Sequence, residues 1–154
     1  MAEALGLGAA LWSPLGGGFL TGKYRTSDEG RINSLLARLV HTENAARETA
    51  ILDAVLAIAK EIGRSPTEVA VAWLLHKARL STTAMIPILG PHTYEQLAGT
   101  LGAVEVTLST EQIARLDETS QIPLGTPHEQ IRDSIAAIAG GNSEALQLRV
   151  IPAV

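Results

Sequence analysis

Two short apolar runs constrain the fold of this chain more than any other feature of its sequence. One spans residues 9–12 and is closed by Ser13 and Pro14, and the other spans residues 82–89 and carries Pro87 near its carboxyl end. Both runs are typical of buried strands, and proline marks where each strand stops because it cannot donate a hydrogen bond to a sheet. Each run leads into glycine, and helical patterns separate the two. Strands that alternate with helices predict an α/β architecture with parallel strands.

Helical patterns fill much of the remaining sequence. Apolar residues recur at three-to-four spacing up to Ile62, and Gly63 follows at the position where glycine often ends a helix. Immediately afterwards, Ser65 and Glu68 have the spacing of a capping box, and Pro66 suits the first turn. Further capping pairs and a row of isoleucines predict the later helices. The predicted helices cover residues 50–62, 66–76, 94–101, 110–116 and 131–138.

The ends of the later helices give three further expectations. Thr93 and Gln96 have the spacing of a capping box, and Gly102 is expected to end the helix that they begin. Asp117 and Glu118, near the end of the next helix, are expected to be solvated charges. They are not interpreted as a catalytic pair of acid and base.

The composition restricts the classes of function. With 154 residues, 46% of them hydrophobic and 18% charged, the chain is expected to form one domain or most of one. Its net charge of -4 argues against binding to nucleic acid or to an anionic membrane. The absence of cysteine excludes disulfides, thiolate catalysis and cysteine-ligated metals. We recognise no signal peptide and no apolar segment of the about 18 residues that cross a bilayer, so a cytoplasmic location is expected.

The segment "SPLGGGFLTGK", residues 13–23, is the strongest candidate for a ligand-binding loop. Glycines allow close approach to the backbone, amides can donate to oxyanions and Lys23 can neutralise one, so the segment predicts a phosphorylated ligand. The residues from Gly17 to Lys23 match the beginning of a phosphate-binding P-loop, but Tyr24 stands where magnesium needs a serine or threonine. The alternative interpretation is a tight turn without a ligand.

Other motifs give weaker indications. Residues 58–75 resemble a helix-turn-helix, but Glu61 and Glu68 lie near the surface that would dock on DNA. Two packed surface helices are therefore the better interpretation. The four histidines lack the spacing of a metal site, and no Gly-x-Ser-x-Gly nucleophile motif occurs. The motifs by themselves predict no catalytic residue and no metal site.

Four segments of the chain occur in an order that is typical of one known family. They are "WSPLGGGFLTGKY", "GRSPTEVAVAWLL", "IPILGPHTYEQLAGTLGA" and "LSTEQIARLDETSQIPLGTPHE". Together they resemble the carboxyl-terminal part of an aldo/keto reductase, and four ordered segments are far more specific than one glycine motif. The resemblance covers residues 1–129 and leaves residues 130–154 as a variable tail, so the chain is interpreted as a single partial domain.

The resemblance implies an α/β fold made of the last two strands of a (β/α)8 barrel and their helices. Members of this family use NADP(H) to reduce aldehydes and ketones. Residues 9–13 and 82–89 would be the seventh and eighth barrel strands, and in this fold the loops after those strands commonly hold phosphate. The implied cofactor-binding residues are Trp12, Ser13, Pro14, Leu15, Gly16, Gly17, Lys23, Arg31, Gly90, His92, Gln96 and Thr100.

The second of these loops departs from the family pattern. His92 stands where many relatives carry Arg or Ser near the adenosine 2′-phosphate, and Thr100 replaces a usual Asn beside the adenine. A neutral histidine cannot offer the fixed fork of a guanidinium, so the sequence leaves the choice between NADPH and NADH open. The helix that begins near Thr93 is still expected to present free amides and a positive dipole end to a phosphate.

The family's catalytic Asp, Tyr, Lys and His belong to the first part of the barrel, for which we find no counterpart in the sequence. Two parallel strands alone would leave unpaired edges and an uncovered apolar face. Three hypotheses remain open. In the first, the chain is the cofactor-binding part of a reductase and needs a complementary barrel fragment for activity. In the second, it is a noncatalytic dinucleotide-binding module that is self-associating or regulatory. In the third, it is a reductase with an unorthodox site.

Overall fold

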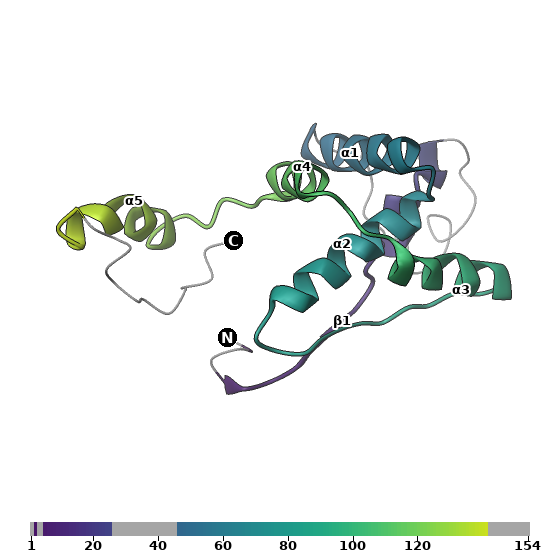
Figure 1. The fold of residues 1–154 in the computed structure, drawn as a ribbon, viewed down its shortest axis with the longest axis horizontal. Helices are drawn as coiled ribbons and strands as arrows, with labels where there is room; N and C mark the ends of the chain where they lie inside the picture. The colour runs from purple at the N-terminus through teal and green to yellow at the C-terminus, as the bar shows by residue number, and fades with distance from the viewer. Residues whose placement is uncertain (1, 3–4, 26–45, 142–154) are drawn as a thin grey trace. The chain divides into compact units, whose positions relative to one another are not determined.

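The computed structural model describes residues 2, 5–25 and 46–141. The chain divides into two compact units, Met1–Thr119 and Ser120–Val154. In chain order, the elements are β1 (Ala9–Leu11), the 3₁₀ helices η2 (Gly16–Thr21) and η3 (Lys23–Arg25), α1 (Ala46–Ile62), α2 (Pro66–Leu80), β2 (Met85–Pro87), α3 (Tyr94–Leu101), the 3₁₀ helix η6 (Gly102–Glu105), α4 (Thr110–Ser120) and α5 (His128–Ile138) (Figure 1).

The two strands β1 and β2 pair in parallel, in a register that places Ala10 opposite Ile86. This confirms the predicted parallel pairing. The second strand begins at Met85, so the prediction that it begins at residue 82 is wrong. The reason is local, because the Thr83 N–H donates to the Ser81 hydroxyl at 3.2 Å and bends the backbone before the strand.

One face of this sheet is exposed. Ala10 and its partner Ile86 are exposed, Ile86 by 63%, whereas their neighbours along each strand are half-buried. Helix α2 contacts β2, and Trp12, directly beyond β1, is 63% exposed. Within the described residues, the sheet therefore has the uncovered apolar face that two parallel strands were expected to leave.

The junction between α1 and α2 is closed by local hydrogen bonds, as the sequence predicts. Gly63 adopts a φ of +66°, and the Arg64 N–H donates to the Ala59 carbonyl at 3.0 Å, which is the hydrogen bond that characterises a Schellman end. The Ser65 N–H then donates to the Glu68 carboxylate at 2.8 Å, and the Glu68 N–H donates to the Ser65 hydroxyl at 3.2 Å. Both bonds of the predicted capping box are present.

The core of the first unit lies between α1, α2 and α4. Helix α2 is at its centre and contacts α1, α3, β2 and the 3₁₀ helix η2 (Figure 1). The interpretation of residues 58–75 as two packed helices is confirmed, because both helices contribute to the buried cluster, but α2 is a central helix and not a surface one. The buried residues of that cluster are Val55, Ile58, Ala59, Val69 and Leu116.

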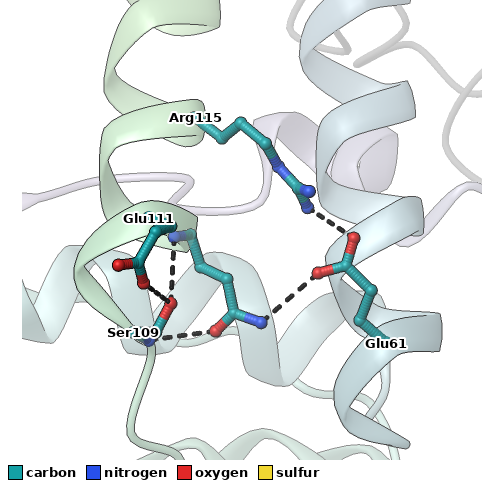
Figure 2. Close-up of polar contacts among 5 residues, drawn as sticks. Glu61, Ser109, Glu111 and Arg115 are labelled. Atoms are coloured by element: carbon teal, nitrogen blue, oxygen red, sulfur yellow. Dashed lines mark hydrogen bonds and ion pairs between the residues drawn. The ribbon is translucent and has the colours of Figure 1, made fainter.

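Polar contacts join α1 to α4, as Figure 2 shows. Glu61 accepts hydrogen bonds from Arg115 at 2.8 Å and from the Gln112 side chain at 3.4 Å. At the start of α4, the Ser109 N–H donates to the Gln112 side chain at 3.0 Å, and the Gln112 N–H donates to the Ser109 hydroxyl at 3.2 Å. Ser109 and Gln112 therefore form a capping box, which also positions Gln112 beside Glu61.

Asp117 is not the solvated charge that the sequence suggested. Its carboxylate accepts hydrogen bonds from the Trp73 indole N–H at 2.7 Å and from Lys77 at 2.6 Å, and only 36% of its side chain is exposed. The Lys77 ammonium also lies 5.6 Å from the centroid of the Trp73 ring. Asp117 thus connects α4 to α2 by hydrogen bonds. A local pattern of charges in the sequence does not reveal such a long-range contact.

Gly102 is the C-cap of α3, as predicted, but it does not end the helical conformation of the chain. Its φ of -54° is right-handed, and the chain continues into η6. A Cβ at this position would lie 2.7 Å from a carboxylate oxygen of Glu68. This position therefore needs a residue without a side chain, because η6 packs closely against α2.

The second unit contains α5, which the isoleucine row predicts correctly. Its Ile131 and Ile138 side chains are exposed, and Gly140 and Gly141 follow the helix with positive φ angles. Among the described residues of the whole chain, no helix combines the length and the apolar character needed to cross a membrane.

Candidate functional site

A cavity of about 600 Å³ lies in the first unit, where the loops that follow β1 and β2 meet the starts of α2 and α3. Both loops follow the carboxyl ends of parallel strands, which is where α/β proteins commonly bind ligands. The cavity is lined by Trp12, Ser13, Pro14, Leu15, Gly17, Gly18, Thr21, Lys23, Ser65, Thr67, Ile88, Leu89, Gly90, Pro91, His92, Gln96, Gly99 and Thr100.

The cavity brings together the two loops that the sequence singled out. Leu15 from the first loop and Gly90 from the second both line it, although they lie 75 residues apart in the sequence. Of the other ten predicted residues, Gly16 lies within the first loop without lining the cavity, and Arg31 lies outside the described residues. The lining residues among the predicted set are Trp12, Ser13, Pro14, Leu15, Gly17, Lys23, Gly90, His92, Gln96 and Thr100.

The first loop uses its glycine amides internally. The Gly16 N–H donates to the Ser13 carbonyl at 2.9 Å, the Gly17 N–H to the Ser13 hydroxyl at 2.9 Å, and the Gly18 N–H to the Leu15 carbonyl at 3.0 Å. Ser13 itself has a φ of +54°, which is rare for a residue other than glycine. The expectation that these glycine amides point at a ligand is wrong, and Lys23 is the charged group that this loop brings to the cavity.

Lys23 and Tyr24 fold back over Gly18. A Cβ on Gly18, whose φ is +100°, would lie 3.1 Å from Lys23 Cε and 3.3 Å from the Tyr24 hydroxyl oxygen. The Tyr24 hydroxyl donates to the Gly17 carbonyl at 3.0 Å, and the Lys23 ammonium lies 4.9 Å from the centroid of the Tyr24 ring. The tyrosine that breaks the P-loop pattern therefore fixes the loop and supports the lysine.

The start of α2 forms a wall of the cavity that the sequence analysis did not assign to the site. Ser65 and Thr67 line the cavity, and the Ser65 hydroxyl also donates to the Glu68 carboxylate at 2.8 Å. Hydrogen bonding from the Ser65 N–H lowers the pKa of Glu68 below its ordinary value. The capping box was visible in the sequence, but only the fold shows that it faces the two loops.

The start of α3 is capped by its own side chains. The Gln96 N–H donates to the Thr93 hydroxyl at 3.3 Å, and the Gln96 side chain accepts from the His92 N–H at 2.8 Å, so Gln96 does not bond the Thr93 N–H as a full capping box requires. The Glu95 carboxylate accepts hydrogen bonds from its own N–H and from the Thr93 hydroxyl, and both lower the pKa of Glu95. The amides of His92, Glu95 and Gln96 therefore donate within the chain, so the expectation of free amides is wrong for these three.

Thr100, one turn further along α3, is buried and lines the cavity. Its hydroxyl donates to the Gln96 carbonyl at 2.7 Å. Its hydroxyl hydrogen is thus committed to the helix, and what Thr100 presents to the cavity is an acceptor oxygen and a methyl group.

Comparison with known proteins identifies the family. The sequence profile described as "Aldo/keto reductase family" matches residues 1–121. The chain belongs to the aldo/keto reductase family. The profile match ends eight residues before Glu129, where the resemblance of the sequence segments was expected to end.

Individual relatives agree with this family assignment. The oxidoreductase YrpG of Bacillus subtilis is 36% identical over 128 residues, which are 83% of this chain and 36% of YrpG. A Schizosaccharomyces pombe protein named "Putative voltage-gated potassium channel subunit beta" is 34% identical over 123 residues, 75% of this chain and 35% of that protein. Aldo-keto reductase str7 of Strobilurus tenacellus is 33% identical over 129 residues, 79% and 37% of the two chains. This family member therefore spans little more than a third of the length of these relatives.

The described part of this aldo/keto reductase family member holds no cluster of three or more His, Asp or Glu side chains that could bind a metal ion. The cavity lining contains one lysine and one histidine, and the rest is apolar or carries hydroxyl and amide groups. Such a lining can bind and orient a ligand with one anionic group.

Proposed function

We propose that this chain is the cofactor-binding, carboxyl-terminal part of an aldo/keto reductase-type carbonyl oxidoreductase, and that its cavity holds a nicotinamide dinucleotide, NADP(H) or NAD(H). In this proposal β1 and β2 are the last two strands of a (β/α)8 barrel. The observation that carries the proposal is that both predicted cofactor loops, each directly beyond a parallel strand, line one cavity.

The residues of the cavity fit this type of ligand. Its volume of about 600 Å³ lies within the range of small-molecule sites, about 300–1,000 Å³. Lys23 supplies a positive charge for a pyrophosphate, Trp12 supplies an exposed aromatic surface, and Thr67 supplies a hydroxyl.

The role of this chain in the chemistry is to bind and orient the cofactor. The nicotinamide, when bound, supplies the hydride for reduction of an aldehyde or ketone. Carbonyl reduction also needs a positioned proton donor, and we assign no side chain of this chain to that role. We therefore propose that the chain alone does not reduce carbonyl compounds and that a complementary barrel fragment supplies the catalytic groups.

A noncatalytic module is the second candidate, and the exposed sheet face favours it. Ala10, Ile86 and Trp12 would be covered if two copies of the chain associated, so a homo-oligomer could fold and bind a dinucleotide without catalysis. One relative carries the name of a channel subunit, which is compatible with an assembly role in this family. In both candidates the protein is proposed to act in the cytoplasm, without nucleic acid or membrane partners.

Calorimetric titration of the full chain with NADPH and NADH, together with an assay of NADPH oxidation with a generic aldehyde, tests the proposal. We expect saturable binding without turnover. Lys23→Ala should weaken binding of both dinucleotides at least about ten-fold, because the cavity loses its lysine. Lys60→Ala, on α1 and outside the cavity lining, is the matched control and should bind normally.

The outcomes separate the candidates. Absence of binding, or equal binding by Lys23→Ala and the unmodified chain, would overturn the proposal. Turnover that Lys23→Ala abolishes would instead support the reductase with an unorthodox site. Sedimentation analysis distinguishes the other two hypotheses, since a stable oligomer without dinucleotide supports the self-associating module.

A further inference from the structure

Thr67 and Thr100 line the cavity from two helices that pack against each other, α2 and α3. Glu68, which directly follows Thr67, has a carboxylate oxygen 2.7 Å from the place that a Cβ on Gly102 would take. Gly102 lies two residues after Thr100, so the two threonines belong to the same part of the lining, which we call the helix wall. Gly99 also lines the cavity here, and a Cβ on it would have open space around it.

Thr100 gives the helix wall a hydrogen-bond acceptor. The residue is buried, and its hydroxyl donates to the Gln96 carbonyl at 2.7 Å. A hydroxyl has one hydrogen and two lone pairs, so the Thr100 oxygen can accept from a ligand but can donate to one only if the bond to Gln96 breaks. An amino group of a ligand suits this position, and a carbonyl oxygen does not.

Thr67 gives the helix wall donors that the helix itself does not use. It is the second residue of α2, in the first turn, where backbone N–H groups lack a partner within the helix. The capping hydroxyl of Ser65 accepts from the Glu68 N–H at 3.2 Å. No described residue accepts a hydrogen bond from the Thr67 hydroxyl or from the Thr67 N–H. Thr67 can therefore donate to a ligand in the cavity.

An acceptor near a donor is complementary to an edge of adenine. The 6-amino group of adenine donates, and a ring nitrogen beside it accepts. The carboxamide of nicotinamide also carries an amino group and an oxygen, but the nicotinamide ring must face a carbonyl substrate. Trp12, at the strand ends, is 63% exposed, whereas Thr100 is 8% exposed. The open end of the cavity therefore suits the nicotinamide, and the helix wall suits the adenine.

We infer that the helix wall binds the adenine of the cofactor, with Thr100 accepting from the 6-amino group and Thr67 donating to a neighbouring ring nitrogen. The inference rests on the proposed function, because it concerns the same cavity. It adds Thr67 to the binding residues and makes Thr100 the residue that selects the base. Neither residue has a role in hydride or proton transfer.

Calorimetric titration of the full chain with NADH, NADPH and their hypoxanthine analogues tests the inference. Each analogue differs from its cofactor in the base alone, which carries a keto oxygen in place of the 6-amino group and a hydrogen on the adjacent ring nitrogen. We expect the more tightly bound of the two cofactors to bind at least about five-fold more tightly than its own analogue. The reason is that the keto oxygen of the analogue meets the acceptor of Thr100 and stays unpaired.

Thr100→Val keeps the shape of the side chain and removes the acceptor. It should weaken binding of the cofactor about five-fold and change binding of the analogue less than about two-fold, so that the preference disappears. Thr100→Ser keeps the hydroxyl and should keep the preference.

Thr67→Val should weaken binding of the cofactor and of the analogue alike, by about five-fold. The hydroxyl that it removes can donate to a ring nitrogen of adenine and can accept from the ring N–H of hypoxanthine. Thr110→Val is the matched control, because Thr110 is the first residue of α4 and does not line the cavity. This control should leave all the affinities unchanged.

The outcomes distinguish this inference from the proposed function. Equal binding of cofactor and analogue by the unmodified chain, or a preference that persists in Thr100→Val, would overturn the role of Thr100 and leave the proposed function standing. Thr67→Val that binds as tightly as Thr110→Val would overturn the role of Thr67. Failure of the unmodified chain to bind any of the dinucleotides would overturn both the inference and the proposed function.

Thermal unfolding curves show whether each variant is folded. If Thr100→Val does not fold, the comparison of cofactor and analogue on the unmodified chain still decides whether the base is selected, and Thr100→Ser shows whether the hydroxyl suffices. A loss of the preference in Thr100→Ser would contradict the inference.

Discussion

The loops after β1 and β2 occupy equivalent places beyond two parallel strands, yet they carry charges of opposite sign. The first loop carries a lysine ammonium, and the second leads into a helix whose first turn carries a glutamate carboxylate. The first loop uses its glycine amides for its own turns and brings the Lys23 ammonium to the cavity. The second loop enters α3, whose first turn is closed by Thr93, Gln96 and the Glu95 carboxylate. Equivalent positions in a fold therefore do not imply equivalent ligand chemistry, because side chains near each backbone donor decide whether it remains available.

The largest expected effect comes from the first loop, through Gly18→Val. A branched side chain at a φ of +100° is strained by about 1–3 kcal/mol, and it would also press on Lys23 and Tyr24. We expect lower thermal stability and loss of dinucleotide binding. Gly63→Ala is the control, because Gly63 has a φ of +66° but open space around it and lies outside the cavity. A Gly18→Val variant that binds normally would show that the loop geometry is irrelevant to the site.

Ser13→Ala should produce the next effect. It removes the hydroxyl that accepts from the Gly17 N–H, a loss of about 1 kcal/mol in the free energy of unfolding. Ser13→Gly removes the same hydroxyl but relieves the strain of a φ of +54°, so it should destabilise less than Ser13→Ala. Chemical denaturation of both variants measures the difference. Equal losses would show that the positive φ of Ser13 carries no strain.

The corresponding change in the second loop is Thr93→Ala. It removes the cap that accepts from the Gln96 N–H, which should cost about 1 kcal/mol of stability and loosen Glu95. Amide hydrogen exchange should show faster exchange at Gln96, whereas the first loop should be unaffected. Faster exchange at Gly17 as well would show that the two loops are one cooperative unit.

The smallest effect concerns acid stability. Hydrogen bonds from the Ser65 N–H hold the pKa of Glu68 below its ordinary value of 4.5 in the folded chain. The group therefore contributes stability above pH 4.5, and this contribution is lost as the pH falls through the lower, folded-state pKa. Glu68→Gln should flatten the dependence of unfolding free energy on pH below about 4.5. If the unfolding free energy of Glu68→Gln depends on pH below about 4.5 as that of the unmodified chain does, the ionisation of Glu68 is not coupled to folding.

The sequence predicts local structure well because its signals are local. Gly63 and the Ser65–Glu68 capping box define the junction between α1 and α2, and the two apolar runs predict the parallel strands. These features depend on residues within four positions of one another or on hydrophobic runs. Nearly all of the predicted cavity residues in the described chain also come together, because the family resemblance carries information on the fold.

The features that the sequence did not predict depend on contacts between elements or on competition for donors. Asp117 bonds to Trp73, 44 positions away in sequence, and no local pattern encodes that contact. In the sequence, Tyr24 only marks a departure from the P-loop pattern. In the structure, its hydroxyl donates to the Gly17 carbonyl and fixes the loop. The amides at the start of α3 can bind a ligand only where no side-chain oxygen of the chain already accepts their hydrogen bonds. Residue spacing alone does not predict which amides these are.

Tryptophan fluorescence during titration with NADH tests the central claim most directly, because the two tryptophans occupy distinct sites. Trp12 lines the cavity, whereas Trp73 donates to Asp117 and does not line it. We predict saturable quenching by NADH that disappears in Trp12→Phe while calorimetry still detects bound cofactor. Binding that quenches Trp12→Phe as strongly as the unmodified chain, or no saturable quenching at all, would contradict a dinucleotide site at the ends of β1 and β2.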